Sequence, residues 1–324
     1  MSKMNNLGGR YGFHSGNGKF KNVEVTENIF FQGNSMVASP RNVWYVDSSK
    51  SSAGSGTSWT SPFNTLALAV AAAGNYDTIL VAENSIETIA TGGITITQTG
   101  LKILGANGSR MRQAAALKII AGTSPMFTIT ADRVEIAGFN LSTRIAYPCI
   151  YIGSVAAGVG TGVYSTWIHD NNFDGYGAST FAVAMGGAGG FGVKTQCDAV
   201  NLVVENNYFA GHVTAAVVVS GTRMSVLNNR FNVPVDTIGV SVVETGSDRG
   251  YWTVNGNEFV GIANASTTAI QFAGNTTAGQ GMVMNNLLSG GWDVTITDNT
   301  GDVGCLNYQG TTTGGSLIDF NSSA

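Results

Sequence analysis

The sequence predicts an all-β protein folded as a right-handed parallel β-helix, in which short strands wind into stacked coils. Two observations lead to this prediction. A segment made of an apolar strand, asparagine and an aromatic residue recurs along the chain, and a second family of short strands falls between its copies. Repeats of this size indicate units that stack on one another. We expect a short N-terminal helix to cap the coils and an extended N-terminal arm to precede them.

The recurring segment is clearest at residues 201–211, with the sequence NLVVENNYFAG. In every copy an asparagine stands two residues before the last apolar residue. These asparagines are Asn171, Asn207, Asn229, Asn257 and Asn286, and the copies are 36, 22, 28 and 29 residues apart. Asparagine tolerates the positive φ of a tight bend, and stacked amides pair with one another. The sequence therefore predicts a structural ladder of these asparagines, with Phe209, Phe231 and Phe259 stacked beside it.

Short strands with alternating apolar residues fall between these copies. They lie at residues 150–152, 183–185, 217–219, 240–242 and 270–272. The alternation indicates strands with one buried face, so the middle residue points outward. In three consecutive coils this residue is apolar, as Tyr151, Ala184 and Val218. The stripe predicts a subunit interface, which we expect in a homotrimer; a loop folded over the stripe is the alternative.

Composition limits the possible partners. The chain has 324 residues, 11% of them charged, and a net charge of −4, so we expect no nucleic-acid partner. No apolar run is long enough for a signal peptide or a membrane span, so we expect no membrane contact. The three cysteines, Cys149, Cys197 and Cys305, have neither zinc nor disulfide spacing. We expect no metal and no cofactor.

Three regions are predicted along the chain. Residues 1–40 form an extended arm, residues 41–308 the β-helix and residues 309–324 a polar tail that adds a last strand or clasps a neighbour. The arm is glycine-rich and lacks a repeat, yet it contains Tyr11, Phe13, Phe30 and Phe31. Aromatic anchors in an extended segment are typical of docking onto a larger surface. Residues 61–73, after a first strand at 42–47, are expected to form the capping helix.

Several segments of the N-terminal half resemble a known superfamily. They are WYVD at 44–47, PFNT at 62–65, DTILV at 77–81 and LKILG at 101–105. Together they resemble the start of right-handed β-helix proteins of the pectate-lyase-like superfamily, which includes lyases, hydrolases and virion proteins. The resemblance implies the fold and does not choose among these functions. An arm followed by a β-helix is similar to the organisation of bacteriophage head-decoration and tailspike proteins.

Candidate catalytic residues are few. The motif GHV at 211–213 lacks the second glycine found in polygalacturonase-like members, and the sequence has no Asp-Asp pair and no Arg-Ile-Lys. Glycoside hydrolysis needs two carboxylates in one groove, but Asp170 and Glu205 are offset by one residue, which places them on opposite faces. We interpret His169 and His212 as turn residues. The glycine-rich residues 187–192 have no helix after them to bind a dinucleotide. We expect no catalytic residues and no enzymatic activity.

These observations predict a structural virion protein. We expect a bacteriophage capsid-decoration protein, made in the host cytoplasm and located in the virion, whose arm binds the major capsid protein or another virion protein. The alternatives are a tailspike or secreted polysaccharide lyase or hydrolase, and a non-catalytic adhesin that binds a host-surface glycan.

Overall fold

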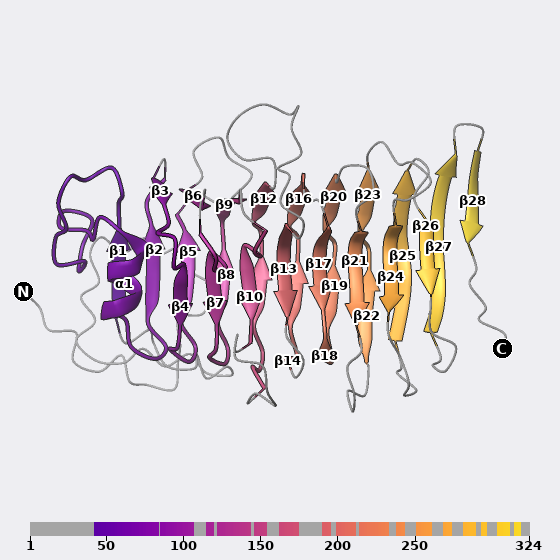
Figure 1. Ribbon diagram of the computed structural model, residues 1–324, viewed down its shortest axis with the longest axis horizontal. Coiled ribbons are helices and arrows are strands. Elements are labelled where there is room, and N and C mark those ends of the chain that lie inside the picture. The colour runs from indigo at the N-terminus through magenta and orange to yellow at the C-terminus, as the bar shows by residue number, and fades with distance from the viewer. Residues whose placement is uncertain are drawn as a thin grey trace, which may run out of the picture. The chain divides into compact units, whose positions relative to one another are not determined.

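The described chain is a right-handed parallel β-helix with three rows of strands (Figure 1). The computed structural model describes residues 42–83, 85–106, 115–119, 122–143, 146–153, 162–174, 190–195, 199–211, 214–232, 238–243, 251–260, 268–273, 281–289, 293–296, 303–311 and 314–318. The attachment residues Tyr11, Phe13, Phe30 and Phe31 lie outside these ranges, as do Ala184 and His212.

The first row contains the strands that precede the asparagine bend. These strands are β1 (Val43–Val46), β2 (Thr78–Val81), β5 (Lys102–Gly105), β8 (Glu135–Ala137), β11 (Trp167–His169), β15 (Val203–Glu205), β19 (Ser225–Leu227) and β22 (Trp252–Asn255). Each pairs in parallel with the strand of the next coil.

The second row follows the bend and belongs to the same sheet. It consists of β3 (Ile86–Thr88), β6 (Ala115–Ile119), β9 (Phe139–Thr143), β12 (Asn172–Asp174), β16 (Tyr208–Ala210), β20 (Arg230–Asn232) and β23 (Glu258–Val260). Strands β25 (Gly281–Ser289) and β27 (Val303–Thr311) run through both rows. Strand β28 (Gly314–Ile318) pairs antiparallel with β27, so a strand is present in the predicted tail.

The third row forms a separate parallel sheet on the other side of the coils. Its strands are β4 (Ile94–Ile96), β7 (Phe127–Ile129), β10 (Ile150–Ile152), β13 (Phe191–Thr195), β17 (Ala215–Val219), β21 (Ile238–Val243), β24 (Thr268–Ala273) and β26 (Asp293–Ile296). A small two-stranded sheet pairs β14 (Ala199–Val200) with β18 (Gly221–Thr222). This third row is the second strand family that the sequence predicts, with one exception.

The exception is the strand expected at residues 183–185. The strand that pairs with both β10 and β17 is β13, and residues 183–185 lie outside the described part. Lys194 therefore takes the outward position between Tyr151 and Val218 that was assigned to Ala184. The outward row is thus not continuously apolar, and Val218 exposes only 9% of its surface.

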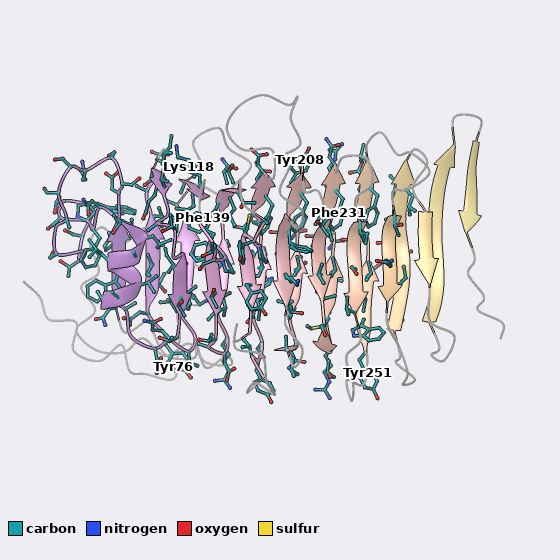
Figure 2. All side chains as sticks on the ribbon, viewed as in Figure 1. Tyr76, Lys118, Phe139, Tyr208, Phe231 and Tyr251 are labelled. Atoms are coloured by element: carbon teal, nitrogen blue, oxygen red, sulfur yellow. The ribbon has the colours of Figure 1, made fainter. Side chains whose placement is uncertain are left out.

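A stack of phenylalanine rings fills the coil interior beside the second row. Phe173, Phe209, Phe231 and Phe259 are fully buried, and the centroids of neighbouring rings lie 4.6 to 5.1 Å apart with their planes within 9° of parallel. Figure 2 labels Phe231 among the side chains of the coils. Glycine residues in the third row leave space for these rings. A Cβ on Gly239 would lie 2.5 Å from the Phe259 ring, and one on Gly192 would lie 2.7 Å from the Phe209 ring.

The asparagine ladder stands at the bend between the first two rows. Asn171, Asn207, Asn229, Asn257 and Asn286 are all buried. Each side-chain oxygen accepts from the backbone of the preceding coil, ending at Phe139, while each Nδ2 donates to a strand carbonyl such as Val204 O. The amides therefore satisfy the buried backbone groups that the bend would otherwise leave unpaired.

Helix α1 (Leu66–Ala72) covers the first coil and is held by two buried carboxylates. Glu87 points inward from β3 and accepts a 2.8 Å hydrogen bond from Leu66 N; burial raises the pKa of Glu87. Asp77 accepts from Trp44 Nε1 and Gly74 N. Burial alone would raise the pKa of Asp77, but these hydrogen bonds outweigh it and the pKa is lowered. The helix is shorter than the predicted 61–73 because Thr65 is its N-cap.

Candidate functional site

A polar trough follows the outer side of the asparagine bend. The residue before each ladder asparagine has a positive φ, and these residues are Asp170, Asn206, Asn228, Gly256 and Asn285. The left-handed conformation turns the chain sharply, so the outward side chains of the first and second rows meet at an angle. The short Asn, Asp and Gly residues at this position leave the angle open to solvent.

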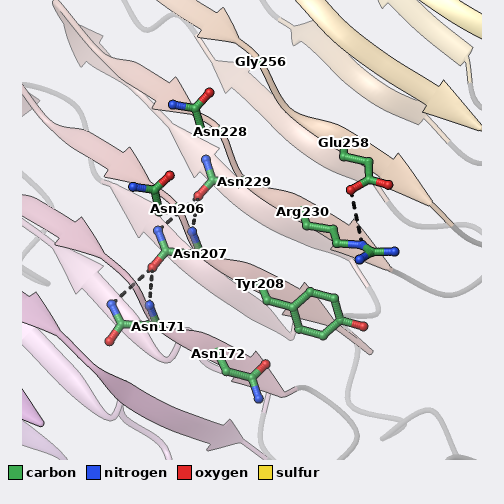
Figure 3. Close-up of a pocket in the computed structure, with 10 residues that line it drawn as sticks. All are labelled: Asn171, Asn172, Asn206, Asn207, Tyr208, Asn228, Asn229, Arg230, Gly256 and Glu258. Carbon is green, nitrogen blue, oxygen red and sulfur yellow. Dashed lines mark hydrogen bonds and ion pairs between the residues drawn. The ribbon is translucent and has the colours of Figure 1, made fainter. Parts of the chain in front are cut away.

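The trough has a volume of about 610 Å³ (Figure 3). Its lining residues are Asn171, Asn172, Asn206, Asn207, Tyr208, Asn228, Asn229, Arg230, Gly256 and Glu258. One wall consists of neighbouring outward positions of the second row, because Tyr208 pairs with Asn172 on one side and with Arg230 on the other. The lining thus combines amides, a phenol, a guanidinium and a carboxylate.

The larger side chains of the trough make two polar contacts. The Tyr208 hydroxyl accepts a 3.1 Å hydrogen bond from Asn232 Nδ2. Arg230 Nε lies 3.4 Å from Glu258 Oε2, and both side chains are largely solvent-exposed. Such an exposed ion pair contributes little to stability and exchanges readily with a ligand. The trough therefore offers hydrogen-bond donors and acceptors beside one aromatic face.

A cluster of charged side chains lies at the end of β11, directly before the trough residues Asn171 and Asn172. His169 Nε2 is 3.2 Å from Glu135 Oε1, and His169 Nδ1 is 2.8 Å from Asp170 Oδ2. Lys102 Nζ, on β5, lies 2.7 Å from the other oxygen of Glu135. The imidazole is therefore held between two carboxylates, which is an arrangement that can hold and transfer a proton.

The cluster changes the acidity of its members. Burial alone would lower the pKa of His169, but the hydrogen bonds with Glu135 and Asp170 outweigh it and the pKa is raised above 6.5. The hydrogen bond from His169, with help from Lys102, holds the pKa of Glu135 below 4.5 against the effect of burial. His169 therefore remains charged to higher pH than an ordinary histidine.

An exposed tryptophan adjoins the cluster. The Trp167 ring stacks on the His169 ring with centroids 3.8 Å apart and planes 24° from parallel, and Trp167 exposes 41% of its surface. Both side chains project outward from β11 because they are two residues apart on one strand. An aromatic face beside a charged cluster can support a sugar ring while polar groups bind its hydroxyls.

Sequence reasoning identified only part of this site. Asp170 lies at the bend with a φ of 52°, whereas His169, which was interpreted as a turn residue, is the last residue of β11 and is hydrogen-bonded to Asp170. Glu205 is the register partner of His169 in the next coil. Lys102, Glu135 and Trp167 were missed, although they occupy neighbouring outward positions of β5, β8 and β11. Aligning the outward residues of the first row would have revealed them.

Two properties of the described residues bear on the expected partners. Within them, no group of three or more His, Cys, Asp or Glu side chains is arranged to hold a metal ion. No helix in the described part of the chain is long and apolar enough to cross a membrane.

Solved structures match the fold, whereas no family model and no curated protein matches the sequence. The A-module of the mannuronan C-5 epimerase AlgE4 from Azotobacter vinelandii has a TM-score of 0.52 and 14% identity, covering 74% of this chain and 70% of that one. A rhamnogalacturonan lyase has a TM-score of 0.51 and 13% identity, covering 81% and 86%. The chain thus has the fold of pectate-lyase-like β-helix proteins.

A viral protein is a more distant match. ORF18 of Geobacillus virus E2 has a TM-score of 0.30 and 14% identity, covering 72% of this chain and 54% of that one. A TM-score at this level supports no inference about this chain.

The expectation that the chain has no enzymatic activity is corrected by these comparisons. Two matching structures with TM-scores above 0.5 are those of an epimerase and a lyase. At 13–14% identity, sequence motifs need not persist even where the fold does. The missing polygalacturonase-like motifs therefore do not exclude catalysis by this chain.

Proposed function

We propose that this chain is a polysaccharide-binding β-helix protein and that the trough beside the asparagine bend is its binding site. The observation that carries the proposal is the lining of the trough, where amides, Tyr208, Arg230 and Glu258 face one open channel. Sugar chains present many hydroxyls and apolar ring faces, and this combination of donors, acceptors and an aromatic ring complements both.

The geometry of stacked coils suits a linear ligand. Neighbouring strands repeat about every 4.8 Å, so the second-row positions from Asn172 to Glu258 extend over about 15 Å. A polymer lying along this row meets a new side chain at each coil. The fold similarity to proteins named for mannuronan and rhamnogalacturonan supports this choice of ligand class.

The cluster around His169 gives the proposed site a group for acid–base chemistry. The protonated His169 ring donates through both nitrogens, to Glu135 and to Asp170, so the exposed Asp170 carboxylate is the group of this cluster that can accept a hydrogen bond from a bound sugar hydroxyl. Trp167 lies on the same face as His169 and offers a ring surface beside it. Binding assays should therefore be accompanied by measurement of reducing ends and of unsaturated products.

Binding to a panel of immobilised polysaccharides, including mannuronan and rhamnogalacturonan, tests the proposal. We expect Tyr208→Ala and Arg230→Ala to weaken binding to the recognised polymer at least tenfold. Tyr251→Asn is the matched control, because Tyr251 is exposed, lies outside the trough and has a φ of 64° that asparagine tolerates. Undiminished binding by both trough variants would show that the ligand lies elsewhere.

We also propose, from the sequence of the arm, that the protein is a virion component. Aromatic residues that include Tyr11, Phe13, Phe30 and Phe31, in a glycine-rich segment of 40 residues, favour attachment to a capsid, as a decoration protein or tailspike, and a homotrimer is the assembly we expect. Removal of residues 1–38 tests the attachment. The truncated protein should remain folded but fail to bind particles that lack their own copy; full occupancy would exclude the arm as the anchor.

A further inference from the structure

A second groove lies on the outer face of the third row, on a different sheet from the trough. Its volume is about 470 Å³. Its lining residues are Gly92, Thr95, Thr123, Ser124, Pro125, Thr128, Ala146, Tyr147, Pro148, Tyr151, Phe191 and Lys194. Thr95, Thr128, Tyr151 and Lys194 are consecutive register partners in β4, β7, β10 and β13. The floor of the groove is thus one outward side chain from each of four coils.

Three aromatic side chains and several hydroxyl groups, among them those of Thr95 and Thr128, line this floor and its margin. Tyr147 exposes 38% of its surface, and Tyr151 and Phe191 are partly exposed. Thr95 and Thr128 present hydroxyl groups on the two neighbouring coils. Aromatic faces bind the C–H surfaces of sugar rings, whereas hydroxyls exchange hydrogen bonds with sugar hydroxyls. A purely apolar partner would leave the threonine hydroxyls without hydrogen bonds, which is unfavourable on burial.

Lys194 gives the groove its charge. Its Nζ lies 4.6 Å from the centre of the Phe191 ring, so the aromatic ring positions the ammonium group beside the groove. Among the described residues, no carboxylate lies within ion-pair distance of Lys194, unlike Lys50 and Lys102. A cation that is held in place and lacks a carboxylate partner favours an anionic ligand.

We propose that this groove binds an anionic sugar unit, with the ring against Tyr151 and Tyr147, hydroxyls toward Thr95 and Thr128, and a carboxylate at Lys194. Among the lining residues Lys194 alone is basic, whereas an extended nucleic-acid ligand needs several basic side chains along its phosphates. The site lies outside the trough, so it is a second point of attachment for an acidic glycan and does not depend on the trough being occupied.

Isothermal titration with oligogalacturonate and with a neutral galactose oligomer of equal length tests the proposal. The full chain should carry Tyr208→Ala and Arg230→Ala, so that the trough does not contribute. We expect the acidic oligomer to bind at least tenfold more tightly than the neutral one, and added salt to weaken it. Lys194→Gln should abolish the preference, whereas Lys118→Gln, on β6 of the other sheet, should preserve it.

Three results would overturn the proposal. The first is that the acidic oligomer does not bind, or binds no better than the neutral one. The second is that Lys194→Gln leaves the preference for the acidic oligomer intact. The third is that a glutamate-rich peptide binds in a Lys194-dependent manner while the sugars do not. Tyr151→Ala provides a second check, because it should weaken both oligomers by removing the ring contact. If Tyr151→Ala instead leaves sugar binding unchanged and alters only the molecular mass of the protein in light scattering, the outward row that contains Tyr151 is a subunit interface.

Discussion

The side-chain oxygen of Asn229 accepts two hydrogen bonds from Asn207, at 2.9 Å from its backbone nitrogen and at 3.1 Å from Nδ2. The Nδ2 of Asn229 in turn donates to Val204 O and to the next asparagine. One amide therefore joins three coils. Only a side chain with both an acceptor and donors can do this, which explains why the ladder is built from asparagine.

Replacing Asn229 with aspartate should destabilise the coils. The carboxylate keeps the acceptor but cannot donate to Val204 O, and it places a charge in a buried position. Each orphaned buried group costs about 1–3 kcal/mol. The midpoint of urea unfolding should fall clearly for Asn229→Asp. Asn228→Asp is the control, because Asn228 is exposed with a φ of 53°, which aspartate tolerates. Equal midpoints for the two variants would contradict the role of the ladder.

Phe231 should be among the most costly residues to truncate. Its ring is fully buried between those of Phe209 and Phe259. Phe231→Ala should lower the free energy of unfolding by about 3–5 kcal/mol, because it removes apolar contact and leaves a cavity. Arg230→Ala changes the adjacent outward residue and should have a much smaller effect. A loss below about 1 kcal/mol for Phe231→Ala would mean that the coil interior is not packed around these rings.

Gly239 should not tolerate even one added methyl group. Its φ is not in the left-handed region, but a Cβ would lie 2.5 Å from the Phe259 ring and 2.7 Å from Ala269 O. Gly239→Ala should cost about 1–3 kcal/mol through overpacking. Gly92→Ala, where a Cβ has open space, should be neutral. Adding Phe259→Leu should make Gly239→Ala less costly, and failure of this double variant to show coupling would exclude a clash with the ring.

The cluster around His169 should make stability depend on pH in two directions. The raised pKa of His169 means that its contribution is complete below pH 6.5 and is lost as the pH rises through its folded value. The lowered pKa of Glu135 means that its contribution is present above pH 4.5 and is lost as the pH falls through its folded value. The contribution of the cluster to stability should therefore be greatest between about pH 4.5 and 6.5.

Proton NMR of the His169 ring gives a direct measurement. Its pKa should lie above 6.5 and should fall in Glu135→Gln, because the hydrogen-bonded carboxylate that raises it is then neutral. Lys118→Gln changes a charge on another strand and should leave the titration unchanged. A wild-type pKa at or below 6.5 would mean that burial outweighs the two carboxylates.

The fold could be predicted from the sequence because the strand, the asparagine and the aromatic residue recur in one frame. In every copy the asparagine and the last apolar residue, such as Asn207 and Phe209, are separated by one residue, whatever the length of the coil. Strand β13 could not be located in this way. The segment between β12 and β13 is longer than its counterparts, and an apolar triplet at 183–185 lies within it.

The candidate sites were harder to predict because they depend on register between coils. Glu135 and His169 are 34 residues apart, and they become neighbours only once their strands are aligned. Tyr151 and Lys194 lie side by side because β13 begins at Phe191. Residues that serve the interior repeat in every coil, whereas residues on the outer face differ from coil to coil. The sequence repeat therefore predicts the buried framework of the coils but not the side chains that come together on their outer face.

The asparagine ladder also determines how such a chain can change in length. Each rung presents the same acceptor to the coil before it and the same donors to the coil after it. A duplicated coil, such as the 28-residue repeat that separates Asn229 from Asn257, would meet matching partners on both sides. Inserting only part of a coil would place an asparagine next to backbone without the next asparagine, so its hydrogen bonds would be lost. Growth by gene duplication is therefore restricted to whole turns, while the loops between rungs remain free to vary.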